Sequence, residues 1–193
     1  MLGLKLPTDP RWVDIAEKNI EEILVDHAYC EQKAASNGIS LIVQFPQRQR
    51  LVDVMAEVVA EEWNHFERVL AELKKRGYQL GPKRSDEYAV RLGKLERKGG
   101  PIEQQLMDKL LIGALIEARS CERFKLLSEQ IADPDLKGFY HELMVSEAGH
   151  YRTFLDLARE YMPAETVRLR WEELLRAEAE IIATLEIRGD RMH

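Results

Sequence analysis

The sequence predicts an all-α protein. We expect four long helices in a bundle, a long basic connection between the second and third of them, and an additional helix at the C-terminal end. Two observations support this class. Apolar residues recur every three or four positions over most of the chain, which is the spacing of one helix face. Proline and glycine pairs separate these periodic stretches, and no stretch has the alternation that a half-buried strand requires.

The composition indicates one soluble globular domain over residues 1–193. Of these residues 45% are hydrophobic and 32% are charged, which is ordinary for such a protein. No apolar run approaches the roughly 18 residues of a membrane-spanning helix, and the start, MLGLKLPTDPRW, lacks the pattern of a secretory signal. The two cysteines, Cys30 and Cys121, form no disulfide framework. A cytoplasmic protein without a membrane partner is therefore expected.

The first two long helices are expected on either side of Pro46. The first starts at Pro10, and the Asn37–Gly38 pair predicts its end or a kink. Residues 39–45, ISLIVQF, are compatible with extended chain or with more helix. The second helix continues to about Arg76, just before a glycine.

The second half of the chain has clearer punctuation. We expect a helix over residues 102–132, followed by the Asp133–Pro134 turn, whose aspartate is a good cap for the next helix. That helix continues to about Tyr161, and a fifth spans residues 164–185. The polar tail, about residues 187–193, is expected to fray.

The connection between the second and third long helices, about residues 74–100, is unusually basic. From Lys74 to Lys98 it has nine basic and three acidic residues, a net charge of +6, whereas the whole chain has a net charge of −6. A short helix over residues 86–95, capped by Ser85, is plausible within it. The segment is either a solvated connector or an anion-binding surface. The candidate phosphate contacts are Lys83, Arg84, Arg91, Lys94, Arg97 and Lys98.

The sequence EEWNHF places a carboxylate and an imidazole on an apolar helix face. Glu62 and His65 follow Met55 and Val58 on one stripe. The fourth long helix repeats the arrangement, because Glu147 and His150 lie on its apolar stripe. A single Glu-x-x-His is most often a surface pair or a satisfied core histidine, but two such pairs on apolar stripes favour a metal site.

Each pair has a further carboxylate on the preceding helix. Glu117 lies 16 residues before the Asp133 turn and Glu147 lies 14 after it, about 24 and 21 Å along their helices, so they meet at one level. Glu122, a rival on a partly apolar strip, is only about 16 Å from the turn. For Glu31 to meet Glu62, residues 37–45 must advance about 15 Å.

Six residues therefore form a candidate metal centre. Four buried carboxylates without a cation would repel one another, and two divalent cations would neutralise them. Carboxylates with imidazoles suit iron or manganese. The six candidate ligands are Glu31, Glu62, His65, Glu117, Glu147 and His150.

Nearby residues have plainer interpretations. Cys30 and Cys121 are interpreted as small buried hydrophobes rather than redox partners. His27, one turn before Glu31, is either a satisfied core histidine or a hydrogen-bonding partner of the ligand shell.

Glu, Glu-x-x-His, Glu, Glu-x-x-His on four helices is the pattern of the ferritin-like dimetal proteins, which this chain resembles. More narrowly, it resembles the bacterial tRNA hydroxylases that act on methylthio-isopentenyladenosine beside the anticodon. The similar stretches are DHAYCEQKAAS (26–36), EEWNHF (61–66), LIGALIEARSCERF (111–124) and KGFYHELMVSEAGHY (137–151).

This resemblance implies that the six residues bind two iron ions and that dioxygen hydroxylates the isopentenyl group. It also implies a tRNA anticodon loop as substrate and an external electron donor, a reductase or ferredoxin-type protein. An unpaired anticodon-loop base is accessible to a pocket, and the basic segment is suited to phosphates.

Other functions fit the same helices. Ferritin-like iron oxidation and storage, or another di-iron oxidase activity, is the main alternative. A rubrerythrin-like peroxidase is less favoured because the sequence has no CxxC motif. A helical interaction protein without metal is the least favoured.

Overall fold

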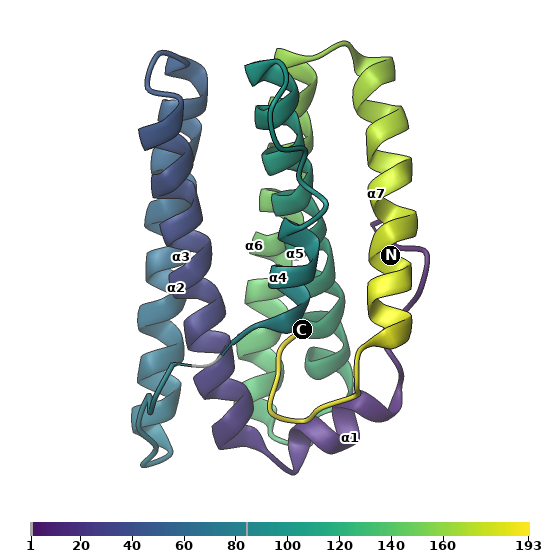
Figure 1. Ribbon diagram of the computed structural model, residues 1–193. Helices are drawn as coiled ribbons and strands as arrows, with labels where there is room; N and C mark the ends of the chain where they lie inside the picture. The colour runs from purple at the N-terminus through teal and green to yellow at the C-terminus, as the bar shows by residue number, and fades with distance from the viewer. Residues whose placement is uncertain (1, 84) are drawn as a thin grey trace. The chain divides into compact units, whose positions relative to one another are not determined.

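A computed structural model describes residues 2–83 and 85–193, and these residues form seven helices and no strand (Figure 1). The predicted all-α class is confirmed. The helices are α1 (Arg11–Glu17), α2 (Ile20–Gln44), α3 (Gln49–Lys75), α4 (Glu87–Gly93), α5 (Ile102–Gln130), α6 (Pro134–Tyr161) and α7 (Ala164–Thr184).

The chain divides into two compact units, each built on one pair of long helices. Unit 1 comprises Met1–Asp14, Asp86–Ile187 and His193 and contains the α5–α6 pair. Unit 2 comprises Ile15–Ser85 and Arg188–Met192 and contains the α2–α3 pair. We expected residues 1–193 to form a single domain, and this expectation stays a prediction.

In unit 2, α2 continues without interruption through the position where we expected its end or a kink. Gly38 lies inside the helix, and a Cβ at this position would be only 2.6 Å from Val59 Cγ2 on α3. The glycine therefore allows close approach of two helices rather than a break. Residues 39–45 are mostly helical, up to Gln44, and Phe45 closes the helix by donating its backbone N–H to Leu41 O at 3.0 Å.

The full length of α2 also explains how Glu31 reaches the level of Glu62. Glu31 lies 13 residues before Gln44, and Glu62 lies 13 residues after Gln49. At about 1.5 Å per residue both carboxylates are about 20 Å from the short α2–α3 connection. The two side chains therefore lie at the same level of the helix pair.

In unit 1, the turn between α5 and α6 forms as predicted. The Asp133 carboxylate accepts hydrogen bonds from the backbone N–H groups of Asp135 (2.9 Å) and Leu136 (3.2 Å), and Pro134 occupies the first turn of α6. These bonds satisfy amides that have no partner within the helix. They fix the point at which α6 turns back along α5.

Helices α4 and α7 complete unit 1 and bury charged groups against α5. Arg119 of α5 donates to Glu178 of α7 through Nε (3.0 Å) and Nη2 (2.6 Å). Both of these donors reach Glu178 Oε1, whereas Arg170 of α7 bonds both oxygens of Asp108 on α5, through Nε at 2.9 Å and Nη2 at 2.8 Å. Such paired, planar contacts satisfy buried charges that would otherwise be costly.

Two local predictions were wrong. The first long helix does not run continuously from Pro10, because α1 ends at Glu17 and α2 begins at Ile20. Asn19 marks the break by donating its backbone N–H to Ala16 O and its side-chain amide to Ile15 O. The cap of α4 is Asp86 rather than Ser85: its carboxylate accepts from Ala89 N at 3.0 Å.

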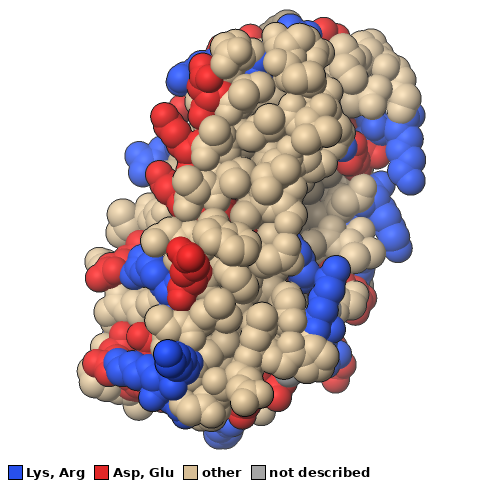
Figure 2. All heavy atoms as spheres, turned by 90° about the vertical axis from the view of Figure 1, so that its left-hand side faces the viewer, with Lys and Arg blue, Asp and Glu red and all other residues tan. Residues whose placement is uncertain are grey.

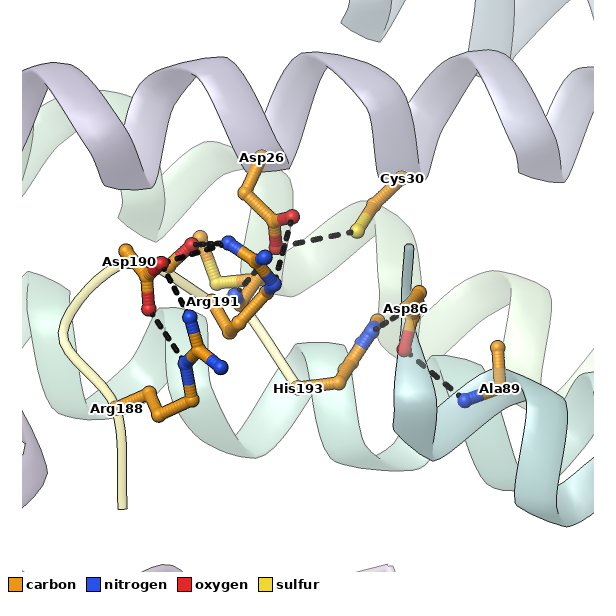
Figure 3. Close-up of polar contacts among 9 residues, drawn as sticks. Asp26, Cys30, Asp86, Ala89, Arg188, Asp190, Arg191 and His193 are labelled. Atoms are coloured by element: carbon orange, nitrogen blue, oxygen red, sulfur yellow. Dashed lines mark hydrogen bonds and ion pairs between the residues drawn. The ribbon is translucent and has the colours of Figure 1, made fainter. Parts of the chain in front are cut away.

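The C-terminal segment is docked rather than frayed, contrary to our expectation (Figure 3). In unit 2, the buried Asp26 accepts the Met192 backbone N–H at 2.7 Å and lies 3.8 Å from Arg191 Nε. Met192 itself is fully buried. In unit 1, His193 lies 3.3 Å from Asp86 Oδ2 through Nδ1 and 2.9 Å from Ser120 Oγ through Nε2. Buried polar partners distant in sequence therefore hold a segment that is polar by composition.

Among the described helices, none is both long enough and apolar enough to span a membrane.

Candidate metal centre

Unit 2 contains three of the six candidate ligands, which we call half-site 2: Glu31, Glu62 and His65. Glu31 extends from α2, while Glu62 and His65 share a face of α3 because they are three residues apart. His65 Nδ1 lies 3.6 Å from Glu31 Oε2 and 3.6 Å from Glu62 Oε2. One ligand atom from each residue lies within 4.8 Å of the other two, which is close enough for one cation to bind all three.

Glu31 has a further partner on its own helix. His27, one turn earlier on α2, is fully buried, and its Nε2 lies 2.6 Å from Glu31 Oε1. Because an ionised carboxylate only accepts hydrogen bonds, Nε2–H is the donor. Of the two interpretations of His27, the structure supports the hydrogen-bonding partner.

Unit 1 contains the other three candidates, half-site 1: Glu117, Glu147 and His150. Glu117 extends from α5, and Glu147 and His150 share a face of α6. His150 Nδ1 lies 3.7 Å from Glu147 Oε2, and one ligand atom from each of the three residues lies within 4.8 Å of the others. The predicted equality of level between Glu117 and Glu147 is therefore realised.

The chemistry of both half-sites fits a hard or borderline divalent cation. Each offers two carboxylates and one imidazole, and all six side chains belong to residues that are at most 5% exposed. Burying carboxylates without a counter-charge is expensive. Oxygen and imidazole donors with room for further ligands are typical of iron and manganese sites.

Glu122, the rival of Glu117, is engaged elsewhere. Its carboxylate accepts from Thr8 Oγ1 at 2.7 Å, from Thr8 N at 3.2 Å and from the buried Arg119 guanidinium. Glu122 thus belongs to the polar core of unit 1, and Glu117 is the α5 carboxylate that faces Glu147 and His150.

The two cysteines have the surroundings of structural residues. Cys121 is buried, and its thiol lies 3.4 Å from Met144 O. Burial raises the pKa of this thiol to about 11, and the nearby carboxylates of Glu147 and Glu122 add to the shift, so it is a thiol at neutral pH. Cys30 is half-buried and lies 3.9 Å from Asp26 Oδ2 (Figure 3).

The basic residues of the crossover are divided between the units. Lys83 is exposed in unit 2, and Arg84 lies outside the described residues. In unit 1, Arg91 donates to Thr184 Oγ1 at 2.6 Å, so it has a structural contact. Lys94, Arg97 and Lys98 are exposed there, with Arg97 4.0 Å from Glu173. The basic residues of the crossover therefore differ in exposure and in the contacts that they make.

The side of the molecule formed by α2 and α3 does not present a continuous basic surface. Figure 2 shows a broad uncharged band with lysine or arginine and aspartate or glutamate side chains along its margins. Unit 2 also exposes three large apolar residues: Ile39, Val43 and Trp63. Positive charge is therefore not concentrated on this side of the molecule.

The tRNA-(MS[2]IO[6]A)-hydroxylase (MiaE) family matches residues 2–193. The chain belongs to this family of hydroxylases.

Two family relatives are named tRNA 2-(methylsulfanyl)-N(6)-isopentenyladenosine(37) hydroxylase. The relative from Pseudomonas putida is 42% identical over 180 residues, which cover 93% of this chain and 86% of that protein. The relative from Salmonella typhimurium is 29% identical over 228 residues, covering 93% of this chain and 83% of that protein.

A solved structure from Synechococcus is also similar. It is described as protein 43 with aldehyde deformylating oxygenase activity, and it is 38% identical with a TM-score of 0.93. The match covers 98% of this chain and 94% of that one. It confirms the predicted ferritin-like fold class of this MiaE-family chain.

Proposed function

We propose that this protein hydroxylates the isopentenyl group of methylthio-isopentenyladenosine next to the anticodon of tRNA. The observation that carries the proposal is the family match over residues 2–193 in a chain with two buried carboxylate–carboxylate–imidazole half-sites. The family indicates the substrate, and the half-sites provide residues suited to the oxidative chemistry.

The six candidate ligands would hold two iron ions, with two carboxylates and one imidazole available for each. Iron with dioxygen supplies the oxidant for inserting oxygen into an unactivated C–H bond. One oxygen atom enters the substrate and the other leaves as water, so each turnover consumes two electrons and two protons. An external reductase or ferredoxin-type donor would supply the electrons.

The chain itself contributes position and exclusion of water. Long helices place the ligands on rigid backbone, and the buried leucines and valines beside them keep the surroundings dry. In half-site 2, His27 holds one oxygen of Glu31 and leaves Oε2 directed toward His65. These are functions of the protein that precede any chemistry at the iron.

The tRNA would be bound partly through phosphates. The exposed basic residues of the crossover are suited to this role, because lysine and arginine contacts with phosphate dominate the affinity for nucleic acid. We propose Lys83, Lys94, Arg97 and Lys98 as contacts, and Arg91 as a weaker candidate because Thr184 already holds it. We also propose a cytoplasmic location, since a tRNA substrate would be available there.

Aldehyde deformylation is a second candidate activity. It is favoured by the 38% identity to the Synechococcus structure over 98% of this chain. Both activities use the same kind of helical scaffold, so the substrate must be tested directly.

The deciding experiment compares substrates on one preparation. Purified protein is loaded with Fe(II), supplied with dioxygen and a chemical reductant, and given either hypomodified tRNA or a long-chain aldehyde. We expect mass spectrometry of digested tRNA to show a gain of one oxygen on the isopentenyl nucleoside, together with loss of this product in cells that lack the protein. Conversion of the aldehyde with untouched tRNA would contradict the proposal.

A further inference from the structure

The two half-sites differ one helical turn before their first carboxylate. In unit 2, the residue four positions before Glu31 is His27; in unit 1, the residue four positions before Glu117 is Gly113. These positions face the same way as the carboxylates because four residues complete about one turn. The residue that differs between the two half-sites is therefore the neighbour of the ligand carboxylate on its own helix.

In unit 2 the space behind the carboxylate is polar. His27 is fully buried and contacts Glu31 Oε1 at 2.6 Å, a distance in the range of hydrogen bonds to ionised groups. The other oxygen, Oε2, lies toward His65 Nδ1. One oxygen of Glu31 is thus held by its own helix while the other is available to a cation.

In unit 1 the equivalent space is filled by a phenyl ring. A Cβ at Gly113 would lie 3.0–3.2 Å from three ring atoms of Phe154, which is itself buried. Phe154 follows His150 by four residues, and the equivalent position after His65 is Val69. In unit 2 the larger residue of this pair, His27, lies on the first helix and the smaller one, Val69, on the second. In unit 1 the order is reversed, with Gly113 on the first helix and Phe154 on the second.

We propose that His27 is a positioning residue that orients Glu31 and makes the two metal positions inequivalent, with half-site 2 the tighter. The inference rests on the proposed metal-binding function. Hydrogen bonds to a ligand carboxylate fix its orientation before the cation arrives, and removal of such partners typically lowers metal affinity about 10–100-fold. In unit 1, position 113 is a glycine, and the Phe154 ring occupies the space into which an imidazole at this position would extend.

The test isolates each half-site with a background substitution. His150→Ala impairs half-site 1, and His65→Ala impairs half-site 2. In each background His27 is changed to Phe, which fills the space without a donor, and to Gln, whose amide can donate. Metal-free full-length protein is titrated with Co(II), and binding is followed by Co(II) absorbance, a readout independent of enzyme turnover.

We expect His27→Phe to lower Co(II) affinity about 10–100-fold in the His150→Ala background. In the His65→Ala background the change should be clearly smaller, because His27 acts through Glu31, a ligand of the half-site that this background already impairs. His27→Gln should regain part of the affinity in the first background. Circular dichroism identifies any variant that fails to fold. If His27→Phe fails to fold, the Co(II) affinity of His27→Gln is compared with that of the same background carrying His27.

Two results would overturn the inference: equal losses in both backgrounds, which indicate a general packing role for His27, or no loss in either. Failure of the proposed metal binding, on which the inference rests, looks different. In that case the protein without substitutions takes up no Co(II) at all, and His27 has no metal to influence.

Discussion

The two long helix pairs present the same three ligand types but are supported differently. The α5–α6 pair of unit 1 packs with α4 and α7 and has buried ion pairs, Arg119–Glu178 and Arg170–Asp108, beside it. Among the described residues of unit 2, no further helix packs on the α2–α3 pair in this way, and the polar support of the pair comes from His27 and from the docked segment at Asp26. The same ligand motif can thus be supported by ion pairs between helices, as in unit 1, or by a neighbour on the same helix and a docked segment, as in unit 2.

The largest expected effect is the loss of one metal per half-site. His65→Ala and His150→Ala each remove the only imidazole of a half-site, so iron content measured by plasma emission should fall from about two ions to about one per chain. If the proposed reaction uses both ions, hydroxylation of tRNA should fall by about 10–100-fold or more in each variant.

His141→Ala is the matched control for these variants. His141 is an exposed histidine on α6, the helix of His150, and its removal should leave iron content and turnover unchanged. Full iron occupancy in either ligand variant would refute the ligand assignment.

The second prediction concerns the buried ion pair between Arg119 and Glu178 in unit 1. Burial raises the pKa of Glu178, and the adjacent Arg119 guanidinium opposes this shift and keeps the carboxylate paired. Arg119→Met leaves that carboxylate buried without its partner, which typically costs about 3–5 kcal/mol of unfolding free energy. Urea unfolding at constant m-value measures the change.

Lys33 provides the comparison in unit 2. It lies two residues after Glu31, as Arg119 lies two residues after Glu117, but it is only half-buried. Its Nζ is buried without a hydrogen-bond partner among the described residues, so Lys33→Met breaks no ion pair and should not destabilise the protein. If both substitutions cost the same, the difference in polar support between the units does not matter for stability.

These contrasts show why some features were predictable from sequence. The two Glu-x-x-His pairs and the Asp133 cap depend on residues a few positions apart, whose geometry a helix fixes by itself. The ion pair between Arg119 and Glu178 joins residues 59 positions apart. No local pattern reports such a partner, although Glu178 on an apolar stripe of α7 was a signal that a partner must exist.

Other errors had the same origin. The Asn37–Gly38 pair predicts a helix end or a kink because such pairs are typical of turns, but close contact with Val59 determines the role of Gly38. The tail was expected to fray because it is polar, yet Asp26 and Asp86 provide buried partners for it. Tertiary contacts overrode local preference in each case.

The third prediction separates the basic residues of the two units. Lys83→Ala in unit 2, and the double substitution of Lys94 and Lys98 by Ala in unit 1, should each weaken tRNA binding. The dependence of log affinity on log salt should flatten by about 0.7 for each lysine that contacts a phosphate. Filter binding at several salt concentrations measures both quantities, and iron content should not change.

Lys125→Ala serves as the control, because this lysine is already paired with Glu129 at 3.3 Å. Turnover of a free modified nucleoside should suffer less than turnover of whole tRNA. Equal loss on both substrates, or unchanged affinity and salt dependence, would count against phosphate contacts in this segment. The unit whose lysines produce the larger change in slope is the one that binds more of the backbone.

The smallest expected effects come from three glycines that test how closely each helix pair packs. Gly38→Ala places a Cβ 2.6 Å from Val59 Cγ2, whereas Gly113→Ala places one 3.0–3.2 Å from the Phe154 ring. Overpacking typically costs about 1–3 kcal/mol, and replacing a helical glycine by alanine returns up to about 1 kcal/mol. Gly38→Ala should therefore destabilise the protein by about 1–2 kcal/mol, and Gly113→Ala by less.

Gly138, which has open space around its Cβ position in α6, provides the control, and Gly138→Ala should stabilise the protein by about 0.5–1 kcal/mol. Urea midpoints at constant m-value rank the three, and the added substitution Val59→Ala should relieve Gly38→Ala alone. If Gly38→Ala stabilised the protein as much as Gly138→Ala, the uninterrupted course of α2 would not depend on close contact with α3.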